Sequence, residues 1–515
     1  MIRSITSALL CLSCVGVSLP LQAATDPFAP AREIIRRHME QKDVPGIAVA
    51  VWQDGKVKWQ EGFGWADMEN RVPVTEHTMF NLASLSKTLT AVGVMTLAEA
   101  GKVNIDGPVN DYLGPDTLTV HVGNPRDVTV RRVANHTSGL GGGDQFFYGE
   151  EAARMPTMAE VIHRYGVVVE APGERYHYSN IGYGVLGHLI ERVSGQPYGD
   201  YLRREVFMPL GMTHSSLVLT PELQKYQAVR YDFDRKPLPF YYSAEPASAA
   251  LYSSAHDLAR FGVFFLKQRL PGQRAILSDA AIDSMFRDPI DIQATPVRAA
   301  GPDSIGYAFG WMSSNQGGYR SVGHGGSSSG VNTQFVMLPA ANLGMVLLAN
   351  ADGGVSGLMD SVLKTLLPKW REPVKAAVVP EPTKPQLPAP ALLGRWEGTV
   401  KTPEGAQPLW LSVQASGEVY LQIGKSAYGR TTAQQRAVLN EVTFSEDGIS
   451  GTSLARIVTA DTKRYPHTVS IRLKLRDGVL CGSAVAASVY DGRWVYGLPH
   501  WAELRKSESV SAVGH

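Results

Sequence analysis

The residues best suited to chemistry in this sequence are the serine and the lysine of Ser84-Leu85-Ser86-Lys87. A serine hydroxyl is a poor nucleophile at neutral pH, so it needs a base within hydrogen-bonding distance and donors for the oxyanion. Residues 88–100 have helical periodicity, which places Ser84 at a helix N-terminus and Lys87 one turn later on the same face. Helix-end amides favour developing negative charge, and burial lowers the pKa of a lysine toward that of a base. The spacing therefore predicts nucleophilic catalysis through a covalent acyl-enzyme.

A second S-x-x-K occurs at Ser361 to Lys364, so this motif alone does not identify the site. The second copy falls within residues 356–366, a predicted amphipathic helix that would cover a sheet face, and no suitable partners follow it. Ser84, in contrast, is followed by Tyr178-Ser179-Asn180, the only Y-x-N in the chain, and by His324-Gly325-Gly326-Ser327 at the end of a predicted strand. Three short motifs in one order are far more specific than any one of them.

Together these motifs resemble those of the serine β-lactamase and penicillin-binding-protein superfamily. The matching segments are residues 80–88, His136-Thr-Ser-Gly-Leu140, Tyr178-Ser-Asn180 and His324-Gly-Gly326. The chain is most similar to the class C-like branch, which includes class C β-lactamases, D-Ala-D-Ala carboxypeptidases, D-aminopeptidases and esterases with a β-lactamase fold. The resemblance covers roughly residues 31–367. It implies a mixed α/β domain packed on an all-helical one, with the active site at their junction.

The resemblance also implies a role for each matching residue. Ser84 would attack the carbonyl carbon, and Lys87 and Tyr178 would share proton transfer. Which of the two is the base in acylation stays open. Asn180 would hold the substrate amide and help to orient Lys87. His136 and Ser138 are assigned to a structural loop.

The third motif implies an oxyanion hole, and its sequence differs from that of the class C β-lactamases. The backbone amides of Ser84 and of Ser327, which follows Gly326, would form the oxyanion hole. Each donor would lower the reaction barrier by about 3 kcal/mol. Class C β-lactamases have Lys-Thr-Gly here, whereas this chain has His324-Gly325-Gly326 and no K-x-G. Histidine at this place resembles the D-peptidase and D-aminopeptidase members. Because an unperturbed histidine titrates near pH 6.5, we expect His324 to recognise a substrate carboxylate more strongly as the pH falls through that region.

Two other interpretations compete with this one. Gly326-Ser327-Ser328-Ser329-Gly330 matches G-x-S-x-G, which lies between a strand and a helix in α/β-hydrolases. Here a strand-like run at residues 332–338 follows it, so Ser328 is not expected to be the nucleophile. The second alternative is a β-lactam-binding or scaffolding protein with a degenerate site, which the intact motifs disfavour. Within the hydrolases, a class C-like β-lactamase or a broad esterase remains open beside a D-amino-acid peptidase.

The elements that must position these motifs come from both ends of one domain. A helix is predicted at residues 31–40, followed by strands at 47–52 and 56–63, which Asp54-Gly55 joins as a hairpin. Further strands are predicted at residues 307–311, 320–324, 332–338 and 345–349, with mostly helical patterns between the two blocks. The sequence therefore predicts an α/β (α+β) domain at residues 25–375: one antiparallel sheet with flanking helices plus an all-helical subdomain.

A second domain follows a proline-rich segment. Residues 376–392 lack a helical or strand period, which predicts a semi-rigid extended linker. In residues 393–515, runs such as 409–413, 419–423 and 469–475 alternate apolar and polar residues between turn signals. They predict a small C-terminal antiparallel β-barrel or sandwich, and we find no catalytic motif in it.

The start of the chain has the pattern of a signal peptide at residues 1–24. A basic start at Arg3 precedes an apolar run, and the small residues Ala23 and Ala24 stand where cleavage would fall. Cys11 and Cys14 lie in this segment, which leaves Cys481 as the one cysteine of the mature chain and allows no internal disulfide. We therefore expect a periplasmic or secreted protein with no stable membrane insertion after signal cleavage.

The charge balance limits the partners. Lys plus Arg (49) nearly equals Asp plus Glu (48), so no broad field exists to attract nucleic acid. The 13 histidines are scattered, and no H-E-x-x-H occurs. We expect a small-molecule or peptide substrate, no metal and no organic cofactor; the sequence leaves the oligomeric state open.

Overall fold

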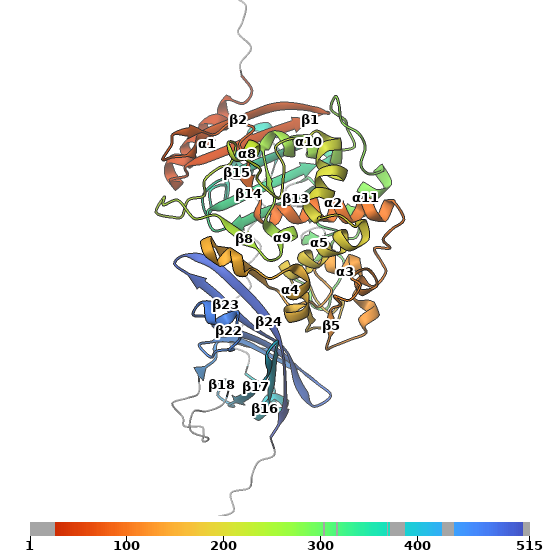
Figure 1. Cartoon of the computed structure of the whole chain (residues 1–515), viewed down its shortest axis with the longest axis vertical. Helices are drawn as coiled ribbons and strands as arrows, with labels where there is room; N and C mark the ends of the chain where they lie inside the picture. Colours follow the sequence, from red (N-terminus) through yellow and green to blue (C-terminus); the bar gives the residue numbers. More distant parts are fainter. Residues whose placement is uncertain are drawn as a thin grey trace, which may run out of the picture.

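The computed structural model describes residues 26–301, 304–315, 318–367, 369–370, 387–424 and 437–507. The predicted signal peptide, residues 376–386 of the predicted linker and residues 508–515 lie outside these ranges. The described chain forms two parts. The larger part comprises the described residues from 26 to 370, and the C-terminal domain comprises those from 387 to 507, whose strands lie below the larger part in Figure 1.

The larger part is built on a nine-stranded antiparallel sheet in the order β10-β11-β12-β13-β14-β15-β1-β2-β3. Its strands are β1 (Gly46–Gln53), β2 (Lys56–Asp67), β3 (Val72–Pro73), β10 (Ile290–Asp291), β11 (Ile305–Tyr307), β12 (Met312–Ser314), β13 (Ser321–Ser328), β14 (Val331–Leu338) and β15 (Leu343–Ala349). β1 pairs with β15, so both ends of the domain sequence meet in one sheet, as predicted. The hairpin at Asp54-Gly55 is confirmed, because Gln53 pairs with Lys56 across those two residues.

One predicted strand is wrong. Residues 307–311 were expected to be extended, but β11 ends at Tyr307 and β12 begins at Met312. Gly310 has φ of 81°, a left-handed conformation, and the backbone N–H of Ala308 donates to the carbonyl oxygen of Trp311 at 2.7 Å. The apolar run is therefore a buried turn, which sequence periodicity does not distinguish from a short strand.

Both faces of the sheet are covered by helices. Ile47, Val49 and Val51 of β1 belong to a hydrophobic cluster that includes residues of α1 (Ala29–Lys42) and α12 (Leu358–Leu366), which pack against each other. The alternate β1 residues belong to a second cluster, and α10 (Ala255–Phe265) packs on that side. Because successive strand side chains point to opposite faces, one strand serves both cores.

The segment between the two strand blocks is mainly helical, as predicted. Its helices are α2 (Ser86–Glu99), α3 (Val130–Ala134), α4 (Met158–Tyr165), α5 (Asn180–Ser194), α6 (Tyr198–Leu202), α7 (Met208–Leu210), α8 (Pro221–Gln224), α9 (Pro246–Ala249) and α11 (Asp279–Phe286). Two short pairings accompany them, β4 (Phe80–Asn81) with β9 (Tyr252–Ser253) and β5 (Thr119–Val120) with β7 (Val167–Val168). Within the described ranges, no helix has the length and apolar character needed to cross a membrane.

The C-terminal domain is a nearly closed antiparallel barrel, within the barrel-or-sandwich prediction. Its strands are β16 (Gly394–Thr402), β17 (Gly405–Val413), β18 (Val419–Ile423), β19 (Ala437–Val438), β20 (Asn440–Phe444), β21 (Gly448–Ser453), β22 (Thr468–Arg476), β23 (Val479–Tyr490) and β24 (Arg493–Lys506). Leu409, Leu411 and Val413 are buried at alternate positions of β17. This period-two burial is the pattern from which the β domain was predicted.

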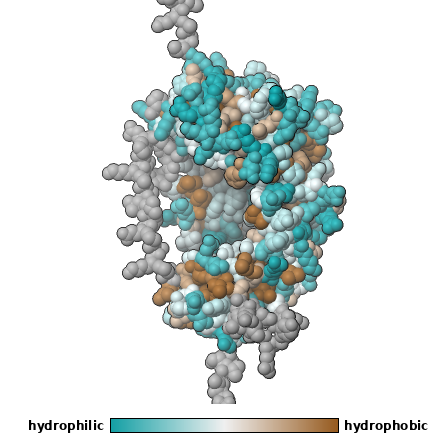
Figure 2. All heavy atoms as spheres, turned by 90° about the vertical axis from the view of Figure 1, so that its left-hand side faces the viewer, coloured by the Kyte–Doolittle hydropathy of each residue, from teal (hydrophilic) through white to brown (hydrophobic). Residues whose placement is uncertain are grey.

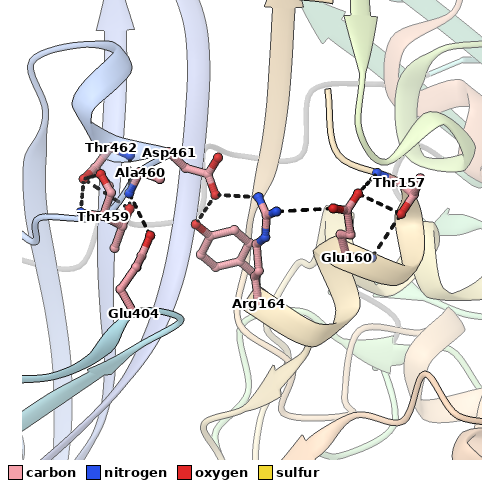
Figure 3. Close-up of polar contacts among 9 residues, drawn as sticks. Thr157, Glu160, Arg164, Glu404, Thr459, Ala460, Asp461 and Thr462 are labelled. Carbon is pink, nitrogen blue, oxygen red and sulfur yellow. Dashed lines mark hydrogen bonds and ion pairs between the residues drawn. The ribbon is translucent and has the colours of Figure 1, made fainter. Parts of the chain in front are cut away.

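The barrel is joined to the larger part by strand pairing and by ion pairs. β6 (Asp144–Tyr148) pairs with β24 on one side and with β8 (Tyr241–Ser243) on the other. Figure 3 shows Arg164 of α4 between Glu160 on its own helix and Asp461 of the barrel, 3.4 Å from each carboxylate. One hydrophobic cluster includes buried residues of both parts. The barrel therefore packs directly on the helical region.

Candidate active site

Ser84 lies in a short 3-10 turn, Ala83–Leu85, that leads directly into α2. Ala83 has φ of 45°, a conformation that L-residues rarely adopt, and the Asn81 carboxamide oxygen accepts its backbone N–H at 2.9 Å. A strained residue held by its surroundings is typical of a functional turn. The sequence placed Ser84 at the helix N-terminus, and the structure places it two residues before Ser86, the first residue of α2, half-buried.

Lys87 is completely buried because α2 is enclosed on nearly all sides. Its Nζ lies 3.1 Å from Ser84 Oγ and donates to the carbonyl oxygen of Ser248 at 2.9 Å. Burial lowers the pKa of Lys87 from 10.5 to about 7, and the charge of Asp144 opposes part of that shift. An amine with this pKa is available in its neutral form at neutral pH, so it can accept the proton of Ser84.

Tyr178 lies beside Lys87, with its ring centroid 4.8 Å from Nζ. Burial raises the pKa of the phenol well above 10, and a side-chain hydrogen bond with Ser84 opposes that shift. The phenol is therefore protonated at neutral pH. The imidazole of His136 packs against its ring at 4.3 Å and accepts the backbone N–H of Ser179 at 3.1 Å. His136 thus helps to hold the Tyr178 segment in place through a ring contact and a backbone hydrogen bond.

Asn180 is the first residue of α5, which the Ser179 hydroxyl caps by accepting the Gly182 N–H at 3.0 Å. The Asn180 carboxamide donates to Asp144 Oδ2 at 2.8 Å. Its oxygen is buried and has no hydrogen-bond partner among the described residues. A carboxamide oxygen with no partner is an acceptor suited to a substrate N–H. The sequence predicts that this side chain orients Lys87. In the structure Asp144 connects the two residues, because it accepts the Asn180 N–H and its charge acts on Lys87.

The third motif lies on β13, against the nucleophile turn. A Cβ atom on Gly326 would lie 2.1 Å from the carbonyl oxygen of Leu82 and 3.1 Å from the backbone nitrogen of Ser84. Thr333, which pairs with Gly326 from β14, donates its hydroxyl to the same Leu82 oxygen at 3.0 Å. Glycine is required for this close approach, and Ser327 follows it on the same strand.

The expected titration of His324 near pH 6.5 is wrong. His324 is 5% exposed, its Nε2 lies 2.9 Å from the Tyr307 hydroxyl, and its Nδ1 lies 2.6 Å from the Gly325 carbonyl oxygen. Burial, together with the nearby charge of Lys87, lowers the pKa of His324 to about 4. The imidazole is therefore neutral at physiological pH and offers no cation to a substrate carboxylate.

We accordingly expect His324→Gln to leave the midpoint of the kcat/KM profile between pH 5.5 and 8 unchanged, even where the overall rate falls. The reason is that an imidazole with a pKa of about 4 changes charge below this range. The measurement is the pH profile of ester hydrolysis by both proteins. A midpoint that moves in the variant would restore the ionic role inferred from the sequence.

The competing serine motifs are not placed for catalysis. Ser361 and Lys364 are exposed on α12, and the Ser361 hydroxyl donates to the carbonyl oxygen of Gly357 at 3.2 Å. Ser328 ends β13, and β14 begins at Val331, so a strand follows the G-x-S-x-G run where a nucleophile elbow requires a helix. Both structural contexts agree with the interpretation of the sequence.

The structure adds Asp144 and Trp494, which sequence reasoning missed. Asp144 Oδ1 accepts the indole N–H of Trp494 at 2.6 Å, so a C-terminal strand reaches this site. The available signal was the Gly141-Gly142-Gly143 run, which marks a close approach of two backbones but does not name the partner.

The tip of the β23–β24 hairpin lies on the left-hand face of the molecule in Figure 1. Figure 2 shows that this face is hollowed near its middle, with hydrophobic residues beside and below the hollow.

None of the described residues forms a group of three or more His, Cys, Asp or Glu side chains arranged to hold a metal ion. The polar groups around Ser84 are instead an amine, a phenol, a carboxamide and backbone amides. This set is suited to proton transfer and to stabilising an oxyanion.

Known proteins share the family pattern and the fold of this chain. The family model described as Beta-lactamase matches residues 31–366. Protein flp of Staphylococcus aureus (strain NCTC 8325 / PS 47) is 25% identical over 323 residues, which are 62% of this chain and 62% of that protein. The match thus spans less than two thirds of this relative's own length.

Two solved structures share the fold. The octameric penicillin-binding protein homologue from Pyrococcus abyssi aligns with a TM-score of 0.55 at 24% identity, over 91% of this chain and 99% of that one. Beta-lactamase/D-alanine carboxypeptidase from Pseudomonas syringae aligns with a TM-score of 0.55 at 18% identity, over 66% and 98%. Because it covers 91% of this chain, the first alignment includes the C-terminal domain. The second covers 66% of the chain, which is close to the fraction that the larger part makes up.

The fold and these matches define a serine hydrolase with a β-lactamase fold. The chain belongs to the beta-lactamase family.

Proposed function

We propose that the protein hydrolyses small amides or esters through an acyl-enzyme on Ser84, and that its substrates are D-amino-acid peptides of the cell-wall type. The observation that carries the proposal is the contact between Lys87 and Ser84: a fully buried amine with a pKa of about 7 lies 3.1 Å from a half-buried hydroxyl. Activation of serine by an adjacent base is the general requirement for this chemistry.

In acylation, the Ser84 oxygen forms a bond to the carbonyl carbon while its proton passes to Lys87 Nζ. The tetrahedral oxyanion is held by the backbone amides of Ser84 and Ser327. Its collapse breaks the bond to the leaving amine or alcohol, which takes a proton through Tyr178. Water then attacks the acyl carbon, gives up a proton to the same groups, and releases the acid and free Ser84. Lys87 is preferred to Tyr178 as the acylation base, because the pKa of the phenol is raised and no phenolate exists at neutral pH.

The substrate class is supported by the third motif and by one relative. His324 replaces the lysine of the class C β-lactamases, which argues against a dedicated β-lactamase. The Pseudomonas syringae protein with the same fold is described as both a β-lactamase and a D-alanine carboxypeptidase. A class C-like β-lactamase or a broad esterase is the second candidate, because Ser84, Lys87 and Tyr178 would serve those reactions equally well. Export to the periplasm or the medium would place the enzyme beside cell-wall peptides.

The test is a hydrolysis panel of a D-Ala-D-Ala peptide, a D-aminoacyl amide, nitrocefin and a short p-nitrophenyl ester. We expect turnover of at least the first or second substrate, and a loss of about 10⁴-fold or more in Ser84→Ala. A fluorescent penicillin or fluorophosphonate should label the wild type but not Ser84→Ala. Labelling with no turnover of any substrate would instead support the binding or scaffolding alternative, and turnover that persists in Ser84→Ala would refute the proposal.

A further inference from the structure

Asp144 is a buried carboxylate at the candidate active site, and no sequence motif marks it. It begins β6 and is 8% exposed. One carboxylate oxygen accepts the Asn180 N–H at 2.8 Å, and the other accepts the Trp494 indole N–H at 2.6 Å. Its charge also acts on Lys87. Because Trp494 belongs to β24, a single carboxylate connects the C-terminal domain with two of the proposed site residues.

We propose that Asp144 and Trp494 are positioning residues of this active site, and that the β23–β24 hairpin of the C-terminal domain is required for the full reactivity of Ser84. The inference rests on the proposed function and gives the C-terminal domain a task in it. Trp494 fixes the Asp144 carboxylate. Asp144 in turn fixes the Asn180 side chain and favours the charged form of Lys87.

The backbone that carries Asp144 is itself part of the C-terminal sheet. β6 pairs antiparallel with β24, with Asp144 opposite Gly497 and Gln145 opposite Tyr496. The Tyr148 hydroxyl at the other end of β6 donates to the carbonyl oxygen of Trp494 at 3.0 Å. A strand held by such a ladder has its side-chain directions fixed by its register. The position of Asp144 therefore depends on β24.

The triple glycine before β6 allows this approach. A Cβ atom on Gly141 would lie 2.4 Å from Cβ of Pro499, and one on Gly143 would lie 2.5 Å from the carbonyl oxygen of Gly497. A Cβ atom on Gly142 would lie 2.9 Å from the carbonyl oxygen of Tyr178. Larger residues would separate the segment from β24 on one side and from the Tyr178 segment on the other. The run thus brings the barrel and the catalytic groups together.

The electrostatic effect on Lys87 has a definite sign. The titratable groups that face Lys87 or Asp144 are Glu245, His136, His324, Tyr178, Tyr183 and Tyr241. Burial raises the pKa of Glu245 to about 8 and lowers those of His136 and His324, so these groups are mainly neutral at pH 7. Burial raises the pKa of Asp144 as well, but the hydrogen bonds from Trp494 and Asn180 and the charge of Lys87 oppose that shift. The ionised Asp144 carboxylate supplies the negative charge that favours the Lys87 ammonium. Removing that charge lowers the pKa of Lys87 further.

The experiment measures the second-order rate of labelling by a fluorescent fluorophosphonate as a function of pH, using the full chain. Wild type should gain reactivity as the pH rises through about 7, where Lys87 loses its proton. In Trp494→Phe and Asp144→Asn, we expect a roughly ten- to hundredfold lower rate at pH 8, because a hydrogen bond to a charged group is lost or weakened. The midpoint should also move to lower pH. A role confined to packing would not move the midpoint.

Trp501→Phe is the matched control. Trp501 lies on the same strand, and its indole N–H donates to the carboxylate of Glu503 at 2.9 Å, within the C-terminal domain. This variant should keep the wild-type rate and midpoint. Thermal melting of each variant checks folding, and the near-isosteric Asp144→Asn carries the test if Trp494→Phe is less stable than Trp501→Phe.

The outcomes separate this inference from the proposed function. Labelling that depends on Ser84 but has the wild-type rate and midpoint in both Trp494→Phe and Asp144→Asn overturns the inference alone. A lower rate with an unchanged midpoint in both variants also overturns it, because the two residues would then have only a structural role. Absence of labelling in the wild type, or labelling of Ser84→Ala, refutes the proposed function itself.

Discussion

Lys87→Met is expected to lower kcat/KM for ester or amide substrates by about 10²- to 10⁴-fold, the usual contribution of a general base. Methionine keeps the long apolar stem inside α2 and removes only the amine that lies 3.1 Å from Ser84 Oγ. The pH profile should change as well. In the wild type, kcat/KM should fall as the pH drops below about 7, because the protonated amine cannot accept the serine proton. The variant should lack this limb.

The control for this prediction is Lys364→Met. Lys364 is the lysine of the second S-x-x-K and is exposed on α12, so wild-type kinetics are expected. Tyr178→Phe decides between the two candidate bases. If the limb near pH 7 disappears in Tyr178→Phe but persists in Lys87→Met, the phenol is the base and the assignment of Lys87 is wrong.

Gly326→Ala is expected to slow acylation of Ser84 by about 10²- to 10³-fold, comparable to the loss of one oxyanion-hole donor. The added methyl group would lie 2.1 Å from the carbonyl oxygen of Leu82 and 3.1 Å from the backbone nitrogen of Ser84. Both of these atoms belong to the backbone, so β13 has to move away from the nucleophile turn. That movement carries the Ser327 amide away from the oxyanion, and the rate of fluorophosphonate labelling measures it.

Gly325→Ala provides the neighbouring comparison. A Cβ atom on Gly325 would lie 3.4 Å from the carbonyl oxygen of Thr333, which is ordinary van der Waals contact. We expect this variant to acylate at close to the wild-type rate. Equal rates in Gly325→Ala and Gly326→Ala would show that the close approach of β13 to the nucleophile turn is not needed for the reaction.

The helix and strand pattern was largely predictable from local sequence. The alternating runs of β14 and β17 and the Asp54-Gly55 turn appear where periodicity and turn chemistry placed them. The order of the motifs was also sufficient to indicate one site, although Ser84 and Tyr178 are far apart in the chain. The error at residues 307–311 arose because a buried turn and a short buried strand have the same apolar composition.

The sequence by itself determined the chemical groups of this site: a serine, a lysine one turn further along the chain, a phenol with a carboxamide, and a glycine strand. These groups can be recognised in the sequence because their spacing follows from the geometry of a helix or a strand. Tertiary structure alone decided their charge states. The pKa values of Lys87 and His324 depend on burial by segments distant in sequence, which local patterns do not report. The same holds for Asp144 and Trp494, whose contact exists only because β6 pairs with a strand of the C-terminal domain.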